Sequence, residues 1–378
     1  MKISIKGIGV LGGFGAGPAM LEHELVNPTK MVTTVSMESS KGRIEVPALL
    51  ADTSDLTDYV GKRALRRAGH YIRMALLSSF CALEDAGMLE TERRGMGIIV
   101  ATGYGATCNT FDFQQSVIDS DDPCGSPTKF ANSVHNAAAG NISLFLNEMG
   151  PNLSVSQYDM SIPSAFMCAL QWLKEGRVDT VLVGGVDEYC KVLGYYWHTR
   201  YNGNSRKVNG TSVNALKHAI IGEGACFFVL AREEDGVSPY GYIEDVQMGN
   251  FLRGRMRLPE STIFFLGADG YSQSEDYYND IIPARARVAS YTHVYGGIPV
   301  GPAFDIAIAA LSARSDTIYG SLQNPAIDYD KLNMVKKDEP LGSGGICCLK
   351  LGADGAFGWI TLNHDNHNEN HIPDRNSQ

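Results

Sequence analysis

The sequence predicts a mixed α/β fold in which helices cover the faces of a buried sheet. Short apolar or β-rich runs of strand length recur along the 378 residues, and helical patterns lie between several of them. Glycine is also abundant, with 41 residues, as expected where many strands turn into helices.

The predicted elements follow from local patterns. His70–Ala86 has apolar residues at i, i+3 and i+4, with Gly87 as its C-cap, and Phe304–Arg314 has similar spacing. The predicted strands are Ile3–Val10, Gly97–Ala101, Asn152–Val155, Thr180–Gly184, Cys226–Ala231, Tyr240–Val246, Ile263–Leu266 and Gly345–Leu351.

A change of composition at Glu233–Ser238 divides the chain. We expect an N-terminal half over residues 1–235, a C-terminal half over 236–362, and a polar, flexible tail over 363–378. The tail contains three histidines, but their spacing fits no compact ligand set, so we predict no metal site.

Charge and cysteine content exclude several classes of protein. The formal net charge of −10 argues against a nucleic-acid partner. The apolar run in MKISIKGIGVLGGFG is too short for a signal peptide, and no stretch approaches the length of a membrane span. None of the eight cysteines forms a C-x-x-C pair, which predicts reduced thiols in a cytoplasmic protein.

The segment SVSQYDMSIPSAFMCAL, residues 154–170, predicts a strand, a sharp corner and a helix. Such corners often present a nucleophile, because the helix N-terminus favours an anion. Here the corner residue is Asp159, which we expect to act as a helix cap or near-cap. Pro163 predicts either a loose first turn or a helix that begins at Pro163 itself.

Around this corner, GPNLSVSQYDMSIPSAFMCALQWLKEGRVDTVLVGGVDE resembles the nucleophile segment of β-ketoacyl synthases of the thiolase fold. ALEDAGM at 82–88 and IIGEGACFFVLA at 220–231 are similar to further family motifs in the same order. The resemblance covers about residues 3–352 and implies a thiolase fold with duplicated αβαβα layers, five layers in all.

The resemblance places the family's catalytic positions on residues that lack their chemistry. The catalytic Cys falls on Asp159, the first His on Asp269, the Lys on His293, the second His on Ile298, and the gating Phe on Ser343. An ionised Asp donates no hydrogen bond to an oxyanion, and Ile donates none at all. The catalytic set is therefore degenerate, which is the pattern of chain-length factors, although better-known members carry Gln where this chain carries Asp159.

The resemblance implies a non-catalytic subunit in a heterodimer with a Cys-containing ketosynthase, without a cofactor. That subunit would shape the partner's acyl or polyketide tunnel and meet acyl carrier protein through the complex. We favour an aryl-polyene-type system. Two alternatives stay open: an atypical enzyme using Asp159, either a malonyl-thioester decarboxylase or an acyltransferase, and a homodimeric acyl-binding protein.

Other sites follow from the same resemblance. The predicted dimer strand is Leu153, Ser154, Val155, Ser156, Gln157 and Tyr158, and the predicted tunnel residues are Phe111, Phe113, Phe130 and Ser133. Core packing is the alternative for the three phenylalanines.

A basic run matches the family's carrier-protein patch in placement. It comprises Lys62, Arg63, Arg66 and Arg67, and a solvated helix face is its alternative. We also expect Asp159, Asp269 and His293 to share a pocket. There the imidazolium would offset one carboxylate while the other takes a cap or a proton.

Overall fold

The computed structural model describes residues 2–29, 32–39, 42–91, 95–119, 125–202, 220–233, 238–259, 263–271, 274–321 and 332–364. The predicted boundary at 235/236, most of the predicted tail and Cys124 lie outside these ranges. The boundary and the tail therefore stay predictions.

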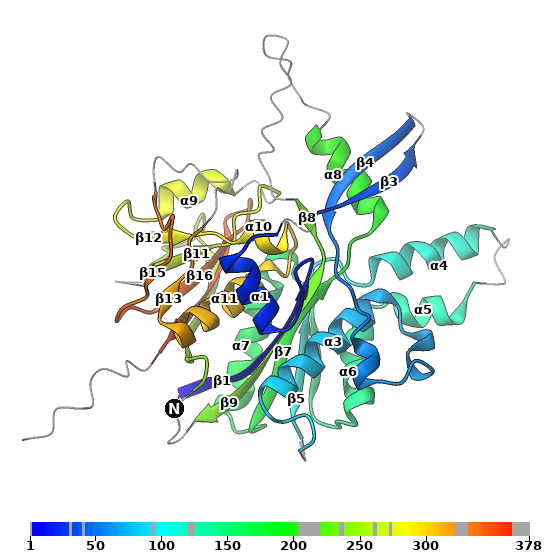
Figure 1. Cartoon of the computed structure of the whole chain (residues 1–378), viewed down its shortest axis with the longest axis horizontal. Coiled ribbons are helices and arrows are strands. Elements are labelled where there is room, and N and C mark those ends of the chain that lie inside the picture. The colour runs from blue at the N-terminus through cyan, green and yellow to red at the C-terminus, as the bar shows by residue number, and fades with distance from the viewer. Residues whose placement is uncertain are drawn as a thin grey trace, which may run out of the picture.

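The main sheet joins two halves that repeat one strand order (Figure 1). The first half has the order β1-β9-β7-β5-β6, and the second has the order β10-β17-β16-β11-β12 with β14 at its edge. Its strands are β1 Lys2–Gly12, β5 Gly97–Ala101, β6 Asn152–Val155, β7 Thr180–Asp187, β9 Gly224–Glu233, β10 Tyr242–Asn250, β11 Ile263–Leu266, β12 Arg287–Ala289, β14 Asn333–Met334, β16 Ile346–Leu351 and β17 Ala356–Asn363.

Strand polarity repeats as well. In each half the first three strands pair antiparallel and the next two join in parallel. The halves meet where β1 pairs antiparallel with β10, with Ile3 opposite Ile243. This repetition is the duplication that the sequence predicted.

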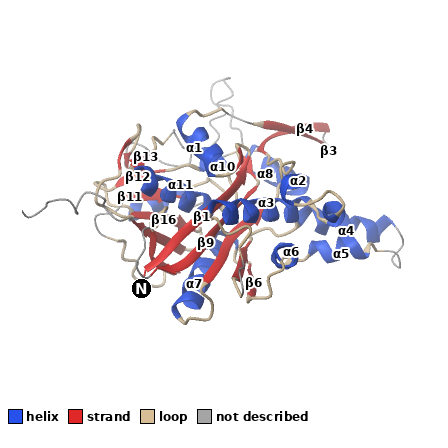
Figure 2. Ribbon diagram, turned by 60° about the horizontal axis from the view of Figure 1, so that its bottom comes forward, coloured by secondary structure: helices blue, strands red, loops and turns tan. Residues whose placement is uncertain are grey.

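Helices pack on both sides of each half-sheet (Figure 2). Between the halves, α7 (Ser161–Lys174) and α11 (Gly301–Ser315) share one apolar core with strands from both. On the outer face of the first half, α3 (His70–Asp85) and α6 (Ala137–Leu146) form a second core. A third core lies on the outer face of the second half, under α9 (Glu275–Ile281). These layers agree with the predicted α-β-α-β-α order.

The remaining elements are short or peripheral. They are β2 Gly15–Ala16, α1 Pro18–Val26, β3 Thr33–Ser39, β4 Gly42–Leu49, α2 Leu56–Tyr59, the 3₁₀ turn η1 Ala64–Arg67, α4 Thr107–Asp119, α5 Pro127–Ser133, the 3₁₀ turn η2 Tyr158–Met160, α8 Lys191–Asn202, β8 Ile221–Gly222, α10 Thr292–Tyr295, β13 Thr317–Ile318 and β15 Glu339–Pro340. The helices α4 and α5 project from the body in both views (Figures 1 and 2). No helix of the described ranges is long and apolar enough to cross a membrane.

Candidate functional site

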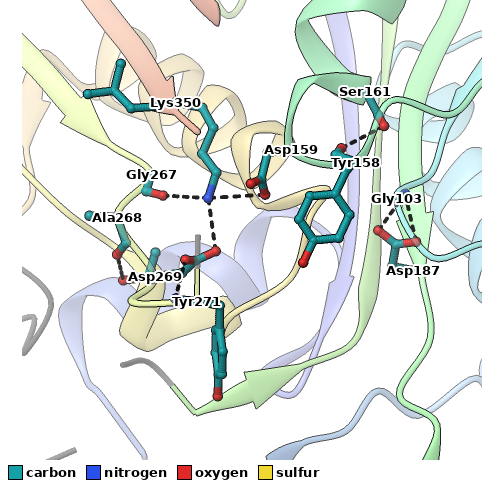
Figure 3. A network of polar contacts seen from close by, with 12 residues as sticks. Gly103, Tyr158, Asp159, Ser161, Asp187, Gly267, Ala268, Asp269, Tyr271 and Lys350 are labelled. Carbon is teal, nitrogen blue, oxygen red and sulfur yellow. Dashed lines mark hydrogen bonds and ion pairs between the residues drawn. The ribbon is translucent and has the colours of Figure 1, made fainter. Parts of the chain in front are cut away.

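The corner between β6 and α7 is a strained turn. Tyr158 has a φ of 50°, a left-handed conformation that is uncommon for a residue with a side chain. The Ser161 hydroxyl stabilises the turn: it donates to the Tyr158 carbonyl oxygen at 2.7 Å and accepts from the Gln157 N–H at 2.8 Å (Figure 3). This turn places Asp159 at the corner between the end of β6 and the start of α7.

Asp159 does not cap the helix, which corrects the sequence-based expectation. The helix begins at Ser161, its N-cap is Met160, and no side chain caps it. Pro163 lies in the first turn, where its missing N–H costs no intrahelical bond. The helix therefore starts two residues before Pro163.

The carboxylate of Asp159 instead faces a buried lysine. Lys350, on β16, has 2% of its side chain exposed, and its Nζ lies 3.5 Å from Asp159 Oδ1 and 2.9 Å from Asp269 Oδ2 (Figure 3). The same Nζ donates to the Gly267 carbonyl oxygen at 2.9 Å. An ammonium group has three hydrogens to donate, and these three oxygens match them in number.

A further contact fixes Asp269, and a third carboxyl group, that of Asp305, is buried in the same half of the chain. Asp269 Oδ1 accepts from the Tyr271 N–H at 2.9 Å, so both oxygens of this carboxylate are engaged. Asp305, on α11, is also buried and accepts from the Tyr295 hydroxyl at 2.8 Å. We call Asp159, Asp269 and Lys350 the ion cluster.

Burial and attraction compete in the ion cluster. Burial raises the pKa of Asp159 to about 6, although Lys350 acts to lower it. Burial alone would lower the pKa of Lys350, but Asp159 and Asp269 outweigh it and raise that pKa well above its usual value. Lys350 therefore carries its charge at neutral pH.

The role predicted for His293 is wrong. Burial lowers the pKa of His293 to about 4, so its imidazole is neutral at pH 7. Its Nδ1 is buried without a hydrogen-bond partner among the described residues. The cation that offsets the carboxylates is Lys350, which sequence reasoning missed. The sequence contained one indication of this role, because Lys350 lies inside the apolar strand ICCLKL. A lysine that is buried in such a strand requires a counter-ion.

A second buried carboxylate supports the neighbouring loop. Asp187, at the end of β7, accepts from Thr102 Oγ1 at 2.6 Å and from the Tyr104 N–H at 2.8 Å. The Gly103 N–H lies 3.1 Å from each of its oxygens (Figure 3). This network, also missed from the sequence, fixes the turn that leads into α4.

A pocket of about 400 Å³ opens above Asp159. Tyr158, Trp197 and Tyr271 contribute aromatic walls, and Arg200 contributes a cation. The Trp197 and Tyr271 rings lie 5.1 Å apart between centroids. The pocket therefore offers aromatic surface and two acidic groups, Asp159 and Asp354, with neither Cys nor His among its lining residues.

Comparison of the sequence with models of known protein families identifies the family. Residues 2–236 match the model for the β-ketoacyl synthase N-terminal domain. The chain belongs to the β-ketoacyl synthase family. The match ends close to the predicted limit of the N-terminal half.

The curated relatives of this β-ketoacyl synthase family member include enzymes named 3-oxoacyl-[acyl-carrier-protein] synthase 2. That of Rhizobium meliloti (strain 1021) is 24% identical over 62% of this chain and 59% of its own length. That of Vibrio harveyi is 21% identical over 51% of this chain and 47% of its own. The matched part thus spans about half the length of these relatives.

Solved structures show the same fold over nearly the whole chain. The ishigamide ketosynthase/chain length factor has a TM-score of 0.77 at 14% identity, covering 97% of this chain and 99% of the other. A type II polyketide synthase acyl-carrier protein in complex with its ketosynthase bound to the hexaketide gives 0.74 at 14% identity, covering 96% and 99%. The thiolase fold expected from the sequence is confirmed.

The positions that the resemblance aligned with catalytic residues have different surroundings. Asp159 and Asp269 meet at Lys350, whereas Ile298 is buried in the central core. Ser343 lines a different cleft of about 950 Å³, together with Arg255 and Trp359. Among the residues with a described placement, no group of three or more His, Cys, Asp or Glu side chains could hold a metal ion.

The predicted tunnel phenylalanines lie on the projecting helices. Phe111 and Phe113 belong to α4, Phe130 belongs to α5, and no side chain of these two fully described helices is buried. The Phe113 and Phe130 rings pack 5.3 Å apart, and Ser133 accepts from Thr110 Oγ1 at 3.2 Å through its carbonyl oxygen. The alternative of core packing is therefore wrong for this chain.

The other predicted surfaces are placed as follows. Leu153, Ser154 and Val155 lie in β6, which is an edge strand, whereas Tyr158 already belongs to the turn η2. Ser156 and Gln157 connect the two. The basic residues Lys62, Arg63, Arg66 and Arg67 are all exposed, in and next to η1.

Proposed function

We propose that this chain is a non-catalytic, chain-length-factor-like subunit that pairs with a Cys-containing ketosynthase and shapes its acyl tunnel. The ion cluster carries the proposal. At the position of the family's nucleophile, Asp159 faces the buried Lys350 ammonium, which is also held by Asp269. A thioester at this position would meet no thiolate, and Ile298 offers no donor for an oxyanion.

The sheet edge supports pairing with a partner. The strand β6 ends the main sheet, and an unpaired edge is a template for another strand. Apolar side chains are exposed beside it: Leu144 is 75% exposed and Met149 93%. An edge strand next to exposed apolar side chains is suited to an interface with a chain of the same fold. The structural neighbours named above include a ketosynthase/chain length factor.

The projecting helices supply the proposed tunnel function. Because Phe111, Phe113 and Phe130 pack outside the chain's own core, they are available to a partner. In the heterodimer they would close the end of the partner's tunnel and limit the acyl chain. We propose an aryl-polyene-type product for this pair.

The exposed basic residues supply a proposed docking patch for an acidic acyl carrier protein. Lys62, Arg63, Arg66 and Arg67 lie close to α5, since Asn132 Nδ2 donates to the Arg67 carbonyl oxygen. In this arrangement the carrier protein would meet the complex near the proposed tunnel residues.

Co-expression with a Cys-containing ketosynthase tests the pairing. Ser154→Pro removes an N–H that faces outward from β6, because the neighbouring Val155 carbonyl oxygen bonds inward to the Thr102 N–H. We expect Ser154→Pro to abolish co-purification and Ser154→Ala to preserve it, since Ser154 Oγ has no partner among the described residues. A chain that is homodimeric alone and ignores the ketosynthase contradicts the proposal and favours the homodimeric acyl-binding protein.

A second candidate is an enzyme that uses Asp159, because this residue lines a pocket and has a pKa near neutrality, about 6. A malonyl-thioester decarboxylase or an acyltransferase would fit such a group. Purified chain incubated with malonyl-carrier protein should release no CO2 above background. Turnover that disappears in Asp159→Ala would establish the enzyme instead.

A further inference from the structure

Two cysteines from distant parts of the sequence meet between α4 and α8. Cys108 is the second residue of α4, and Cys190 directly precedes α8. Cys108 Sγ donates to the Tyr189 carbonyl oxygen at 3.3 Å, and this carbonyl group is bonded directly to the Cys190 nitrogen, so the two side chains are neighbours. Both are free thiols.

The surroundings of the two sulfurs differ in charge. Cys190 directly precedes α8, and the Val192 and Leu193 N–H groups of the first turn act to lower the pKa of its thiol, because such donors stabilise a thiolate. On the other side, Glu188 Oε1 accepts from the Cys108 N–H at 2.7 Å, which places a carboxylate beside the Cys108 thiol.

Protonation follows from these contacts. The Cys108 thiol and the helix N–H groups lower the pKa of Cys190 to about 6, against the effects of burial and of Asp112. The hydrogen bond to Cys190, burial and the negative charges of Glu188 and Glu223 raise the pKa of Cys108. Of the two thiols, Cys190 is therefore the more readily ionised.

We propose that Cys108 and Cys190 form a peroxide-reactive dithiol, in which Cys190 is the nucleophile and Cys108 the resolving thiol. The Cys190 thiolate attacks one oxygen of hydrogen peroxide. An S–O bond forms, the O–O bond breaks, and the departing hydroxide takes a proton to leave as water.

The Cys108 sulfur then attacks the sulfenic sulfur of Cys190. The S–S bond forms as the S–O bond breaks, and the second oxygen leaves as water with the Cys108 proton. In total two thiols are oxidised to one disulfide and one peroxide is reduced to two waters. Cys190 is 4% exposed, so the oxidant in this proposal is a small one. The new bond would join the start of α4 to the start of α8.

The test uses the full chain alone, treated with hydrogen peroxide and mapped by mass spectrometry without reduction. We expect a Cys108–Cys190 disulfide in the unmodified protein and in Cys168→Ser, a control on α7. In Cys108→Ser, dimedone should trap a sulfenic acid on Cys190. In Cys190→Ser, dimedone labelling of Cys108 should be at least about tenfold weaker.

Two outcomes overturn the proposal: both cysteines remain alkylatable after peroxide treatment, or dimedone labels Cys108 in preference to Cys190. If Cys190→Ser fails to fold, the peptide map of the unmodified protein and the labelling of Cys108→Ser still decide. Neither measurement depends on a ketosynthase partner, so the result stands apart from the proposed function.

Discussion

The side chain of Lys350 determines the electrostatic surroundings of Asp159. A lysine on a buried strand is tolerated because two carboxylates and a carbonyl oxygen surround its ammonium. The cluster joins η2, β16 and the loop after β11, so it connects the two halves of the chain. Asp159, which the sequence resemblance aligned with the family's catalytic Cys, is therefore part of a buried ion pair.

Lys350→Met should be strongly destabilising. The substitution leaves Asp159 and Asp269 buried together without their cation, a type of change that costs about 3–5 kcal/mol in the free energy of unfolding. Urea denaturation followed by circular dichroism measures it. The triple variant with Asp159→Asn and Asp269→Asn should recover part of the loss, because the buried charges are then removed.

Lys6→Met is the matched control for this substitution. Lys6 pairs with Glu233 near the surface, and removing such a pair costs only about 0–1 kcal/mol. Equal losses for Lys350→Met and Lys6→Met would contradict the structural role of the ion cluster.

For single residues, the sequence predicted where the acidic side chains lie better than it predicted which side chains they contact. The corner was expected at Asp159, and Asp269 was expected close to it, because motif order places them. Lys350 was missed because nothing in a strand's periodicity tells which counter-ion its charged residue meets. The neutral state of His293 was missed for the same reason: its burial arises from tertiary packing.

Among the elements, the α4–α5 pair departs most from expectation. Periodicity could not separate core packing from exposure for Phe111, Phe113 and Phe130, and the structure places all three outside the apolar cores. By contrast, β5, β6 and β11 begin and end at the predicted residues, because short apolar or β-rich runs bounded by turns leave a clear pattern whether the strand is buried, as β5 and β11 are, or at the sheet edge, as β6 is.

Phe130→Ala should therefore cost little stability in the isolated chain. It removes a half-exposed ring pair with Phe113, worth about 0.5–1.5 kcal/mol. Phe166→Ala, on α7 in the central core, should cost about 3–5 kcal/mol. Thermal and urea unfolding of both variants test the difference.

If Phe130→Ala proved as costly as Phe166→Ala, the projecting helices would pack on the chain's own body and not be available to a partner. In a reconstituted heterodimer, Phe130→Ala should also shift the product masses towards longer chains. Unchanged products from a stable complex would contradict the proposed tunnel role.

At the scale of the whole molecule, four buried carboxyl groups among the described residues have raised pKa values because burial penalises their charged forms. They are Asp159 and Asp187 at about 6, and Glu188 and Asp305 at about 7. In the unfolded chain such groups titrate near 4. Between those values the folded state binds more protons than the unfolded state, so stability falls as pH rises through the window from about 4 to about 7.

The two perturbed histidines act in opposite directions. Burial lowers the pKa of His293 to about 4, so its contribution is lost as pH falls below about 6.5. For His70, burial acts to lower the pKa, but the hydrogen bond and charge of Glu223 raise it. His70 therefore contributes stability that is lost as pH rises. The lowered pKa of Cys190, about 6, also favours higher pH. Two opposing groups, His293 and Cys190, stand against five, and the balance predicts a protein that is more stable at pH 5.5 than at pH 8.

Urea midpoints at pH 5.5 and pH 8 at constant ionic strength test this prediction. We expect the free energy of unfolding to be higher at pH 5.5 than at pH 8 by at least about 1 kcal/mol. This is a low threshold, because a shift of one pKa unit on a single group already corresponds to about 1.36 kcal/mol. Asp305→Asn removes one buried carboxyl group and should reduce the difference, whereas Asp58→Asn, at an exposed site on α2, should leave it unchanged. A protein more stable at pH 8 would mean that these carboxyl groups are solvated in the folded state.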